Sequence, residues 1–386
     1  MSVDWAAAFA PRMAGMMASE IRELLKLIDQ PDIISFAGGI PDPDLFPREA
    51  IAEAYRSVFE SNDQWATALQ YSVSEGYAPL RDWISGYHAR NGAAVDAEEI
   101  VVTNGSQQGL DFLGKLLIGP GNPVAVSLPT YLGALQAFSP YQPRYLTVPM
   151  DADGIRPDLL EPVLAQRPKF LYLVPDFQNP NGITLSAERR AAVLDLCTRF
   201  AVPIIEDAAY TELRYDDAPV PSLLALDRAR GAGGGGPEGS GIVIHAGTFS
   251  KTIAPALRIG WVTAPRAVIR KLVLIKQAGD LHCGTINQIV MHRVAEAAFA
   301  QQVSRIRPVY RARRDAMLQA LADFFPASVR WTKPEGGMFV WLDCRRASMA
   351  PTCWNGRCAR RASPSCPAPR SIPTGPAPIP AGSVSP

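Results

Sequence analysis

The chain has 386 residues, 47% of them hydrophobic, with 38 basic and 37 acidic side chains that leave a net charge of +1. This length and composition indicate a globular protein of two or three domains with a large buried core. The N-terminus has no basic region followed by an apolar core, and no apolar run approaches the ~18 residues of a membrane helix, so we expect a cytoplasmic protein.

Charge is unevenly distributed along the chain. Residues 344–386 contain six arginines and no other charged residue, so 32 basic residues face 37 acids in residues 1–343, a net charge of −5. Such a body has no electrostatic attraction for nucleic acid or for an anionic membrane. Four of the six cysteines also lie in residues 344–386, without histidines or a C-x-x-C pair at metal-ligand spacing. We therefore expect reduced thiols and no metal site.

The N-terminal part predicts two helices and a segment that can approach a ligand. Ala18–Ile28 has apolar residues at helical spacing and carries Arg22, which could simply be solvated. Gly39 follows another glycine in a proline-rich stretch, where backbone can approach a ligand closely because no Cβ intervenes. Tyr71 lies in a Ser/Gly-rich turn before a helix that begins near Pro79, and it could serve only for packing.

A strand, a turn and a helix follow one another in the next stretch. We predict the strand at Ile100–Thr103, the turn at Asn104–Gln107 and the helix at Gln108–Ile118. The start of a helix after a Gly-Ser turn presents free N–H groups and a positive dipole end. Such a turn suits a phosphate, although it is weak evidence alone.

Short apolar strands then alternate with helical or loop stretches. This alternation predicts an α/β fold with a mostly parallel central sheet covered by helices on both faces. Ligands of such sheets bind at the carboxyl ends of strands, where Tyr131, Asn179, Asp207 and Tyr210 lie. The predicted strands are Pro123–Leu128, Arg144–Val148, Phe170–Val174, Val202–Glu206 and Gly241–His245, and the clearest helix is Ala187–Phe200.

The segment GTFSKTIAPALRIG, residues Gly247–Gly260, combines an amine, hydroxyl groups and a fixed positive charge. Lys251 lies beside Thr248 and Ser250, and Arg258 follows seven positions later. This set predicts a phosphate site beside a nucleophilic amine, which suits pyridoxal 5′-phosphate held by the lysine as a Schiff base. A lysine near a strand end is usually just solvated, so the segment needs support from the rest of the chain.

Each further role in pyridoxal phosphate chemistry has a candidate residue at a strand end. The chemistry needs a carboxylate that keeps the pyridine nitrogen protonated, because only the pyridinium withdraws electrons effectively. Asp207 is the candidate for this role. The candidate donors to the phenolic oxygen are Asn179 and Tyr210, and Tyr131 could stack on the ring. The candidate phosphate ligands are Ser106, Gln107, Thr248, Ser250 and Arg258.

Motifs in one order over about residues 15–343 carry a family resemblance. They are IRELLKL, SFAGGIPDPDLFP, LQYSVSEGYAPLR, TNGSQQGLD, PTYLGALQAF, FLYLVPDFQNPNG, EDAAYTELRY, GTFSKTIAPALRIGW, KQAGDLHCGTINQ and KPEGGMFVWLD. With them the chain resembles fold type I, class I/II aminotransferases, closest to the α-aminoadipate and kynurenine-type branch of broad specificity. The resemblance implies a large cofactor domain at residues 50–280 and a small domain from residues 1–49 and 281–343.

The resemblance also implies the reaction and the site. It implies a ping-pong transfer of an amino group between an amino acid and a 2-oxo acid, in a homodimer with a shared active site. Lys251 would hold the cofactor and shuttle the proton, Asp207 would pair with the pyridine nitrogen, and Tyr71 would come from the second subunit. Gly39 would lie over the substrate, and Arg22 would bind the distal carboxylate of an acidic donor. The remaining cofactor contacts would come from Ser106, Gln107, Tyr131, Asn179, Tyr210, Ser250 and Arg258.

The motifs stop at Asp343, and residues 344–386 have a different character. They contain nine prolines, no acid and no periodic apolar pattern, which predicts disorder. A family member would continue with a helix, a strand and an R-L-S-F segment whose arginine binds the substrate α-carboxylate. Back-translated with GC-leaning codons and read one frame over, residues 344–386 give such a helix, strand and R-L-S-F. We therefore interpret this tail as the product of a shifted reading frame.

Three alternative functions remain open. The first is a chain that binds pyridoxal phosphate but is catalytically impaired, because the tail replaces the α-carboxylate arginine. The second is another reaction of the same cofactor, such as β-elimination or decarboxylation. The third is a regulatory domain, which would carry an N-terminal winged helix and a basic linker; we expect neither before Ala18.

Overall fold

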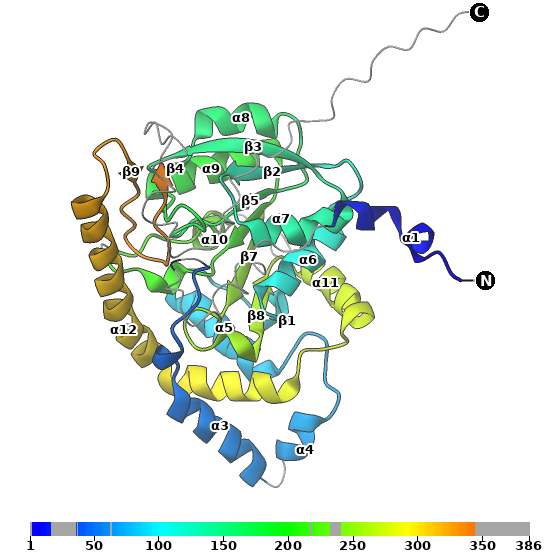
Figure 1. Cartoon of the computed structure of the whole chain (residues 1–386). Coiled ribbons are helices and arrows are strands. Elements are labelled where there is room, and N and C mark those ends of the chain that lie inside the picture. Colours follow the sequence, from blue (N-terminus) through cyan, green and yellow to red (C-terminus); the bar gives the residue numbers. More distant parts are fainter. Residues whose placement is uncertain are drawn as a thin grey trace, which may run out of the picture.

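Figure 1 shows the fold as a computed structural model of the chain. The predicted helix Ala18–Ile28 with Arg22, and the tail after Asp343, lie outside the described residues. The structure describes residues 2–16, 36, 38–61, 64–216, 218–231 and 241–343.

An eight-stranded sheet forms the centre of the protein, in the order β1-β8-β7-β6-β5-β2-β3-β4. Strands β7, β6, β5, β2 and β3 run parallel to their neighbours in that order, whereas β8 runs antiparallel to both β1 and β7 and β4 runs antiparallel to β3. The predicted α/β class with a mostly parallel sheet is confirmed. The strands are β1 Ile100–Asn104, β2 Pro123–Leu128, β3 Arg144–Asp151, β4 Gly154–Ile155, β5 Leu171–Leu173, β6 Ile204–Asp207, β7 Val243–Thr248 and β8 Ile259–Thr263.

Helices and 3₁₀ turns connect and cover these strands. The helices are α1 Trp5–Ala8, α3 Arg48–Glu60, α4 Gln64–Leu69, α5 Ala78–Arg90, α6 Ser106–Leu117, α7 Leu132–Phe138, α8 Pro157–Leu164, α9 Ala187–Phe200, α10 Leu223–Gly231, α11 Arg266–Gly279 and α12 Thr285–Phe324. The 3₁₀ turns are η1 Pro11–Gly15, η2 Pro43–Leu45, η3 Ala97–Glu99, η4 Ser139–Tyr141, η5 Thr211–Leu213 and η6 Pro255–Leu257. The long α12 runs past the sheet along one side (Figure 1).

The two faces of the sheet bury two separate hydrophobic clusters. Alternation along β1 shows the division, because Ile100 and Val102 belong to one cluster and Val101 to the other. The first cluster includes residues of α5, α8, α9, α10 and α12, and the second includes residues of α6, α7 and α11. The sheet is thus covered on both faces, and the edge formed by the carboxyl ends of its parallel strands is left for a site.

Two predictions of local structure need correction. Ile259–Thr263 forms β8, although the sequence analysis assigned these residues to a motif and to no strand. Helix α6 begins at Ser106 and not at Gln108, because Gly105 at its N-cap adopts φ 74°, which turns the chain out of β1 directly into the helix. Both differences arise where strands meet the predicted cofactor motifs.

A short antiparallel pair, β9 Arg330–Trp331 and β10 Leu342–Asp343, follows α12 and ends the described part of the chain. The division into a large domain at residues 50–280 and a small domain from residues 1–49 and 281–343 stays a prediction. Within the described ranges, no helix is both long enough and apolar enough to cross a membrane.

Candidate active site

The adjacent parallel strands β6 and β7 bring two ionisable residues to one edge of the sheet. Asp207 is the last residue of β6 and pairs in register with Ala246 of β7. Lys251 follows the end of β7 by three residues, in a turn where the Ser250 N–H donates to Thr248 Oγ1 at 3.1 Å. The parallel direction of the strands is what places the carboxylate and the amine at the same edge.

Lys251 is largely enclosed. Its Nζ donates to the Gly39 carbonyl oxygen at 3.4 Å and lies 5.7 Å from the centre of the Tyr210 ring. Burial lowers the pKa of Lys251 to about 8, the positive charge of Arg258 acts in the same direction, and Asp207 opposes both. A substantial fraction of this amine is therefore neutral near pH 8, as a nucleophile or a general base requires.

Asp207 is a buried carboxylate with one unused oxygen. Its exposed fraction is 3%, and the Tyr172 hydroxyl donates to its Oδ2 at 2.8 Å. Its Oδ1 is also buried and has no hydrogen-bond partner among the described residues. Burial raises the pKa of Asp207 to about 6, against the opposing effects of the Tyr172 hydrogen bond and His245. A protonated pyridine nitrogen, which is a cationic N–H donor, fits this orphaned acceptor.

Two tyrosines and an asparagine surround this pair. Asn179 Nδ2 donates to the Tyr210 hydroxyl at 3.4 Å, and Phe339 packs edge-on against the Tyr210 ring at 5.6 Å. Tyr131 packs over Gly133, where a Cβ would lie 2.4 Å from its ring and hydroxyl atoms. Burial and then Asp207 raise the pKa of Tyr131 to about 12, so its hydroxyl stays protonated. The three side chains thus provide neutral donors and a ring face beside the Lys251 amine.

Arg258 and Gly105 form one half of a candidate phosphate site. The Arg258 guanidinium packs on Gly105, where a Cβ would lie 2.3 Å from Nη2, so a side chain at position 105 would displace the guanidinium and would be strained at φ 74°. Arg258 donates to the carbonyl oxygens of Asn104 and Pro255, at 3.2 Å each. Its own backbone adopts φ 55°, which turns the side chain back onto the end of β1 at the start of β8.

The N-terminus of α6 forms the other half. Ser106 and Gln107 lie in the first turn of this helix, whose leading N–H groups have no intrahelical acceptor. Gln107 Nε2 donates to the Gly133 carbonyl at 2.6 Å, which fixes its side chain beneath Tyr131. Together with Arg258, this turn presents positive charge and free donors to an anion, so the described residues fit the phosphate of the predicted cofactor.

The structure therefore brings most of the predicted site residues together. Lys251, Asp207, Tyr210, Asn179 and Gly39 form one group, and Tyr131, Ser106, Gln107, Ser250 and Arg258 line the adjoining turn. Tyr71 stands apart, 79% exposed, with its ring edge-on to His282 at 6.0 Å. Arg22 lies outside the described residues.

Two contacts of the site were not predicted. Tyr172 bonds Asp207, and Phe339 packs against both Tyr210 and the position of Gly39. Tyr172 was within reach of sequence reasoning, because it pairs with Ile205 in the neighbouring strand and so shares a sheet face with Asp207. Phe339 was not, because its position depends on a chain reversal after α12.

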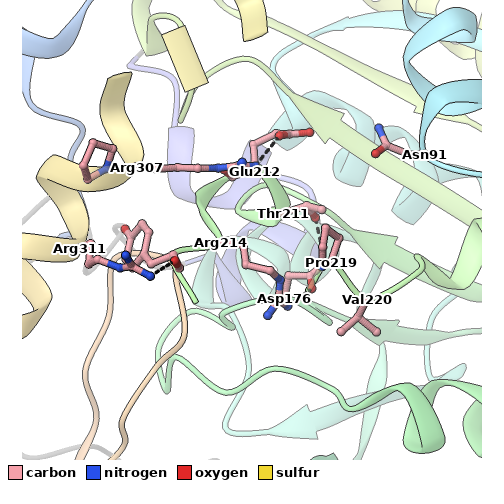
Figure 2. A pocket seen from close by; sticks show the side chains of 11 residues that line it. Asn91, Asp176, Thr211, Glu212, Arg214, Pro219, Val220, Arg307 and Arg311 are labelled. Carbon is pink, nitrogen blue, oxygen red and sulfur yellow. Dashed lines mark hydrogen bonds and ion pairs between the residues drawn. The ribbon is translucent and has the colours of Figure 1, made fainter. Parts of the chain in front are cut away.

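A second pocket, of about 360 Å³, lies between η5 and α12 (Figure 2). Its charges are paired within the chain. Arg307 bonds Glu212 at 3.1 Å, and Arg214 reaches Asp176 at 3.5 Å. The pocket is lined by Asn91, Asp176, Thr211, Glu212, Arg214, Tyr215, Pro219, Val220, Arg307, Pro308 and Arg311. Because its ions neutralise one another, we assign it to the support of η5, which directly follows Tyr210.

Comparison with known proteins gives a consistent family. The family model "Aminotransferase class I and II" matches residues 31–363, and so continues past Asp343. The aromatic-amino-acid aminotransferase 1 of Thermococcus litoralis is 42% identical over 88% of this chain and 80% of its own, and the 2-aminoadipate transaminase of Thermus thermophilus is 42% identical over 88% and 82%. The crystal structure of the α-aminoadipate aminotransferase LysN of Thermus thermophilus, complexed with N-(5′-phosphopyridoxyl)-L-leucine, superposes with a TM-score of 0.80 at 42% identity and covers 88% and 83% of the two chains.

The lowered pKa of Lys251 predicts how the reactivity of its amine changes with pH. Only the neutral amine attacks an aldehyde, so the rate of reductive methylation of Lys251 in cofactor-free protein should be half its maximum near pH 8 and level off about one pH unit higher, whereas an ordinary lysine has its midpoint near 10.5. Mass spectrometry after brief formaldehyde labelling measures this rate, with exposed Lys115 as the internal reference. A rate at Lys251 that still rises steeply at pH 10 would contradict the described burial.

Proposed function

The chain belongs to the class I and II aminotransferases and transfers amino groups with pyridoxal phosphate, and we propose that its amino donors are amino acids with long side chains, acidic or apolar. The relatives named above support both kinds of donor, since they are an aromatic and a 2-aminoadipate enzyme and a complex with a leucine adduct. Phe339 over the position of Gly39 supplies an apolar surface beside Lys251. We place 2-aminoadipate first, followed by glutamate, aromatic and branched-chain donors.

The observation that carries the assignment of the cofactor is the orphaned Oδ1 of Asp207, together with the lowered pKa of Lys251, which leaves a substantial fraction of its amine neutral near pH 8. When bound, pyridoxal phosphate supplies an aldehyde that receives the amino group and a pyridinium that withdraws electrons from the substrate Cα. Asp207 Oδ1 accepts the pyridine N–H and keeps that nitrogen protonated. Lys251 Nζ would take the proton from the substrate Cα and deliver it to C4′ of the cofactor, and the second half-reaction would run the same transfer in reverse.

The other residues of the site would hold and orient the cofactor. Tyr210 and Asn179, which are hydrogen-bonded to each other, would donate to the phenolic oxygen of the cofactor, and Tyr131 would stack on its ring. The first turn of α6, with Ser106 and Gln107, binds the phosphate together with Ser250 and Arg258. These neutral donors and fixed cations are set before the ligand arrives, so binding requires little rearrangement.

A half-reaction tests the donor class. Mixed with a single amino acid, the cofactor-loaded protein should lose its visible absorbance fastest with 2-aminoadipate and regain it with 2-oxoglutarate. The Lys251→Ala variant should show neither change, because the proton carrier at Cα is missing. Stopped-flow absorbance follows both directions. Release of carbon dioxide or ammonia, without recovery by the oxo acid, would instead indicate a decarboxylase or lyase.

We further propose a homodimer in which Tyr71 completes the phosphate site of the partner subunit. Tyr71 is exposed and its ring packs on His282, and Trp65, Leu69 and Val73 around it are also exposed. An apolar surface of this kind is typical of a protein contact. A second copy of the chain would bury it.

Mixing two inactive variants tests this arrangement. Tyr71→Ala and Lys251→Ala chains, unfolded and refolded together, form hybrid dimers in which one site has both native residues if Tyr71 acts across the interface. We expect recovery of roughly a quarter of the wild-type activity, since half of the dimers are hybrid and one of their two sites works. Each variant refolded alone is the control. A mixture no more active than the controls would place Tyr71 within its own subunit.

The composition of residues 344–386 favours a second candidate, an aminotransferase chain that binds cofactor but works poorly. If this tail arises from a shifted frame, the arginine for the α-carboxylate is replaced. Losing a buried, bidentate guanidinium–carboxylate pair costs about 3 to 5 kcal/mol, or roughly a hundred- to several thousand-fold in substrate use.

Restoring the frame separates the two candidates. We expect the 386-residue chain to transaminate slowly or to aggregate, and a chain whose tail is read in the restored frame to be faster by about that factor. Steady-state kcat/KM with 2-aminoadipate compares them, after resequencing the gene around the codon for Asp343. Equal activity of the two chains, with the printed frame verified, would remove the frame-shift hypothesis.

A further inference from the structure

A buried lysine that none of the steps above uses lies beneath the candidate phosphate turn. Lys276, near the end of α11, has an exposed fraction of 0%. Its Nζ donates to both carboxylate oxygens of Asp280, at 3.0 and 2.9 Å, and to Gln108 Oε1 at 3.2 Å. Cys283 Sγ lies 3.1 Å from the same nitrogen. The ammonium is thus surrounded by four polar atoms of the chain itself.

The partners of Lys276 bracket the turn on both sides. Asp280 Oδ2 accepts hydrogen bonds from Asn104 Nδ2 at 2.7 Å and from Gln108 Nε2 at 2.8 Å. Gln108 Oε1 in turn accepts from the Asn104 backbone N–H at 2.9 Å. Asn104 and Gln108 are the residues directly before and after positions 105–107. One carboxylate therefore closes a ring around the segment whose N–H groups face the phosphate.

The hydrogen bonds that join Asp280, Asn104 and Gln108 also extend to Arg258, on the other side of the candidate phosphate site. The backbone carbonyl oxygen of Asn104 accepts from Arg258 Nη2 at 3.2 Å. The backbone N–H, the side-chain amide nitrogen and the backbone carbonyl of Asn104 are all engaged in this way. Any movement of Asp280 would thus shift both the start of α6 and Arg258.

We propose that Lys276 is a positioning residue for the phosphate-binding turn, acting through Asp280 on Asn104 and Gln108. The inference rests on the proposed function, because it assumes that residues 105–107 and Arg258 bind the cofactor phosphate. Burial of a charged pair is seldom the most stable way to fill a core, and apolar side chains could join α11 to α6. What the ionic ring adds is a fixed position for donors on two segments distant in sequence.

The test compares a ligand that has the phosphate with one that lacks it. Cofactor-free full-length protein is titrated with pyridoxal 5′-phosphate and with pyridoxal, and the two Kd values are measured by absorbance. In Lys276→Met we expect the Kd of the phosphate form to rise about tenfold, as when a group that orients a ligand-binding residue is removed, and that of pyridoxal to stay within about twofold. Asn104→Ala, which cuts the ring but leaves the half-buried Asp280 paired with Lys276, should show the same phosphate-specific loss if Lys276→Met does not fold.

Arg228→Met is the matched control. It breaks the ion pair of Arg228 with the largely buried Glu99, 2.7 Å apart, at the opposite end of β1 from Asn104, and should leave the ratio of the two Kd values unchanged. A Lys276→Met or Asn104→Ala protein that keeps the wild-type ratio, as Arg228→Met does, would overturn the positioning role. A wild-type protein that binds both ligands equally would instead overturn the phosphate site and with it the proposed function.

Discussion

The buried Asp207 and the half-buried Lys251 lie at one edge of the sheet without the full set of partners that enclosed charges normally have, and the site depends on them. Asp207 keeps an unbonded oxygen, and among the described residues the Lys251 amine donates to a backbone carbonyl alone. Burial raises the pKa of the first to about 6 and lowers that of the second to about 8. Each value moves toward the neutral form of its group. For Lys251 that is the form that catalysis needs, whereas for Asp207 the site by itself disfavours the carboxylate charge. A cationic ligand at Asp207 reverses this for the carboxylate.

The buried carboxylate of Asp176, in contrast to that of Asp207, has hydrogen-bond partners on both of its oxygens. Asp176 Oδ1 accepts from Arg190 at 2.5 Å and from Arg214 at 3.5 Å, and its Oδ2 accepts from Thr211 at 2.9 Å. This network stands directly behind η5 and holds the segment that carries Tyr210. The Asp176 carboxylate behind the site is thus fully hydrogen-bonded, whereas Asp207 in the site keeps an unbonded oxygen. This arrangement is expected where stability is given up for function.

Sequence reasoning was accurate where a local pattern determines the structure. The parallel strands follow from apolar runs, and the residues after them, Asp207 and Lys251, were located because parallel strands end at one edge. Strand β8 was missed because its first residues belong to the motif around Arg258 and its apolar residues show no alternation of their own. Tyr172 and the ring of Lys276 were missed because they depend on register and on contacts between segments distant in sequence. Arg22 and the tail stay predictions.

The position of β8 between β1 and β7 also governs the order in which parts of the chain can fold. Asn104 pairs with Ile259, so the start of α6 and Arg258 meet only after a very long segment has folded back. Closing so long a loop is entropically costly and slow. Cofactor in the medium therefore recognises only chains that have finished this step, and by mass action it retains them in the native state. A cofactor concentration well above its Kd therefore increases the fraction of chains that stays folded.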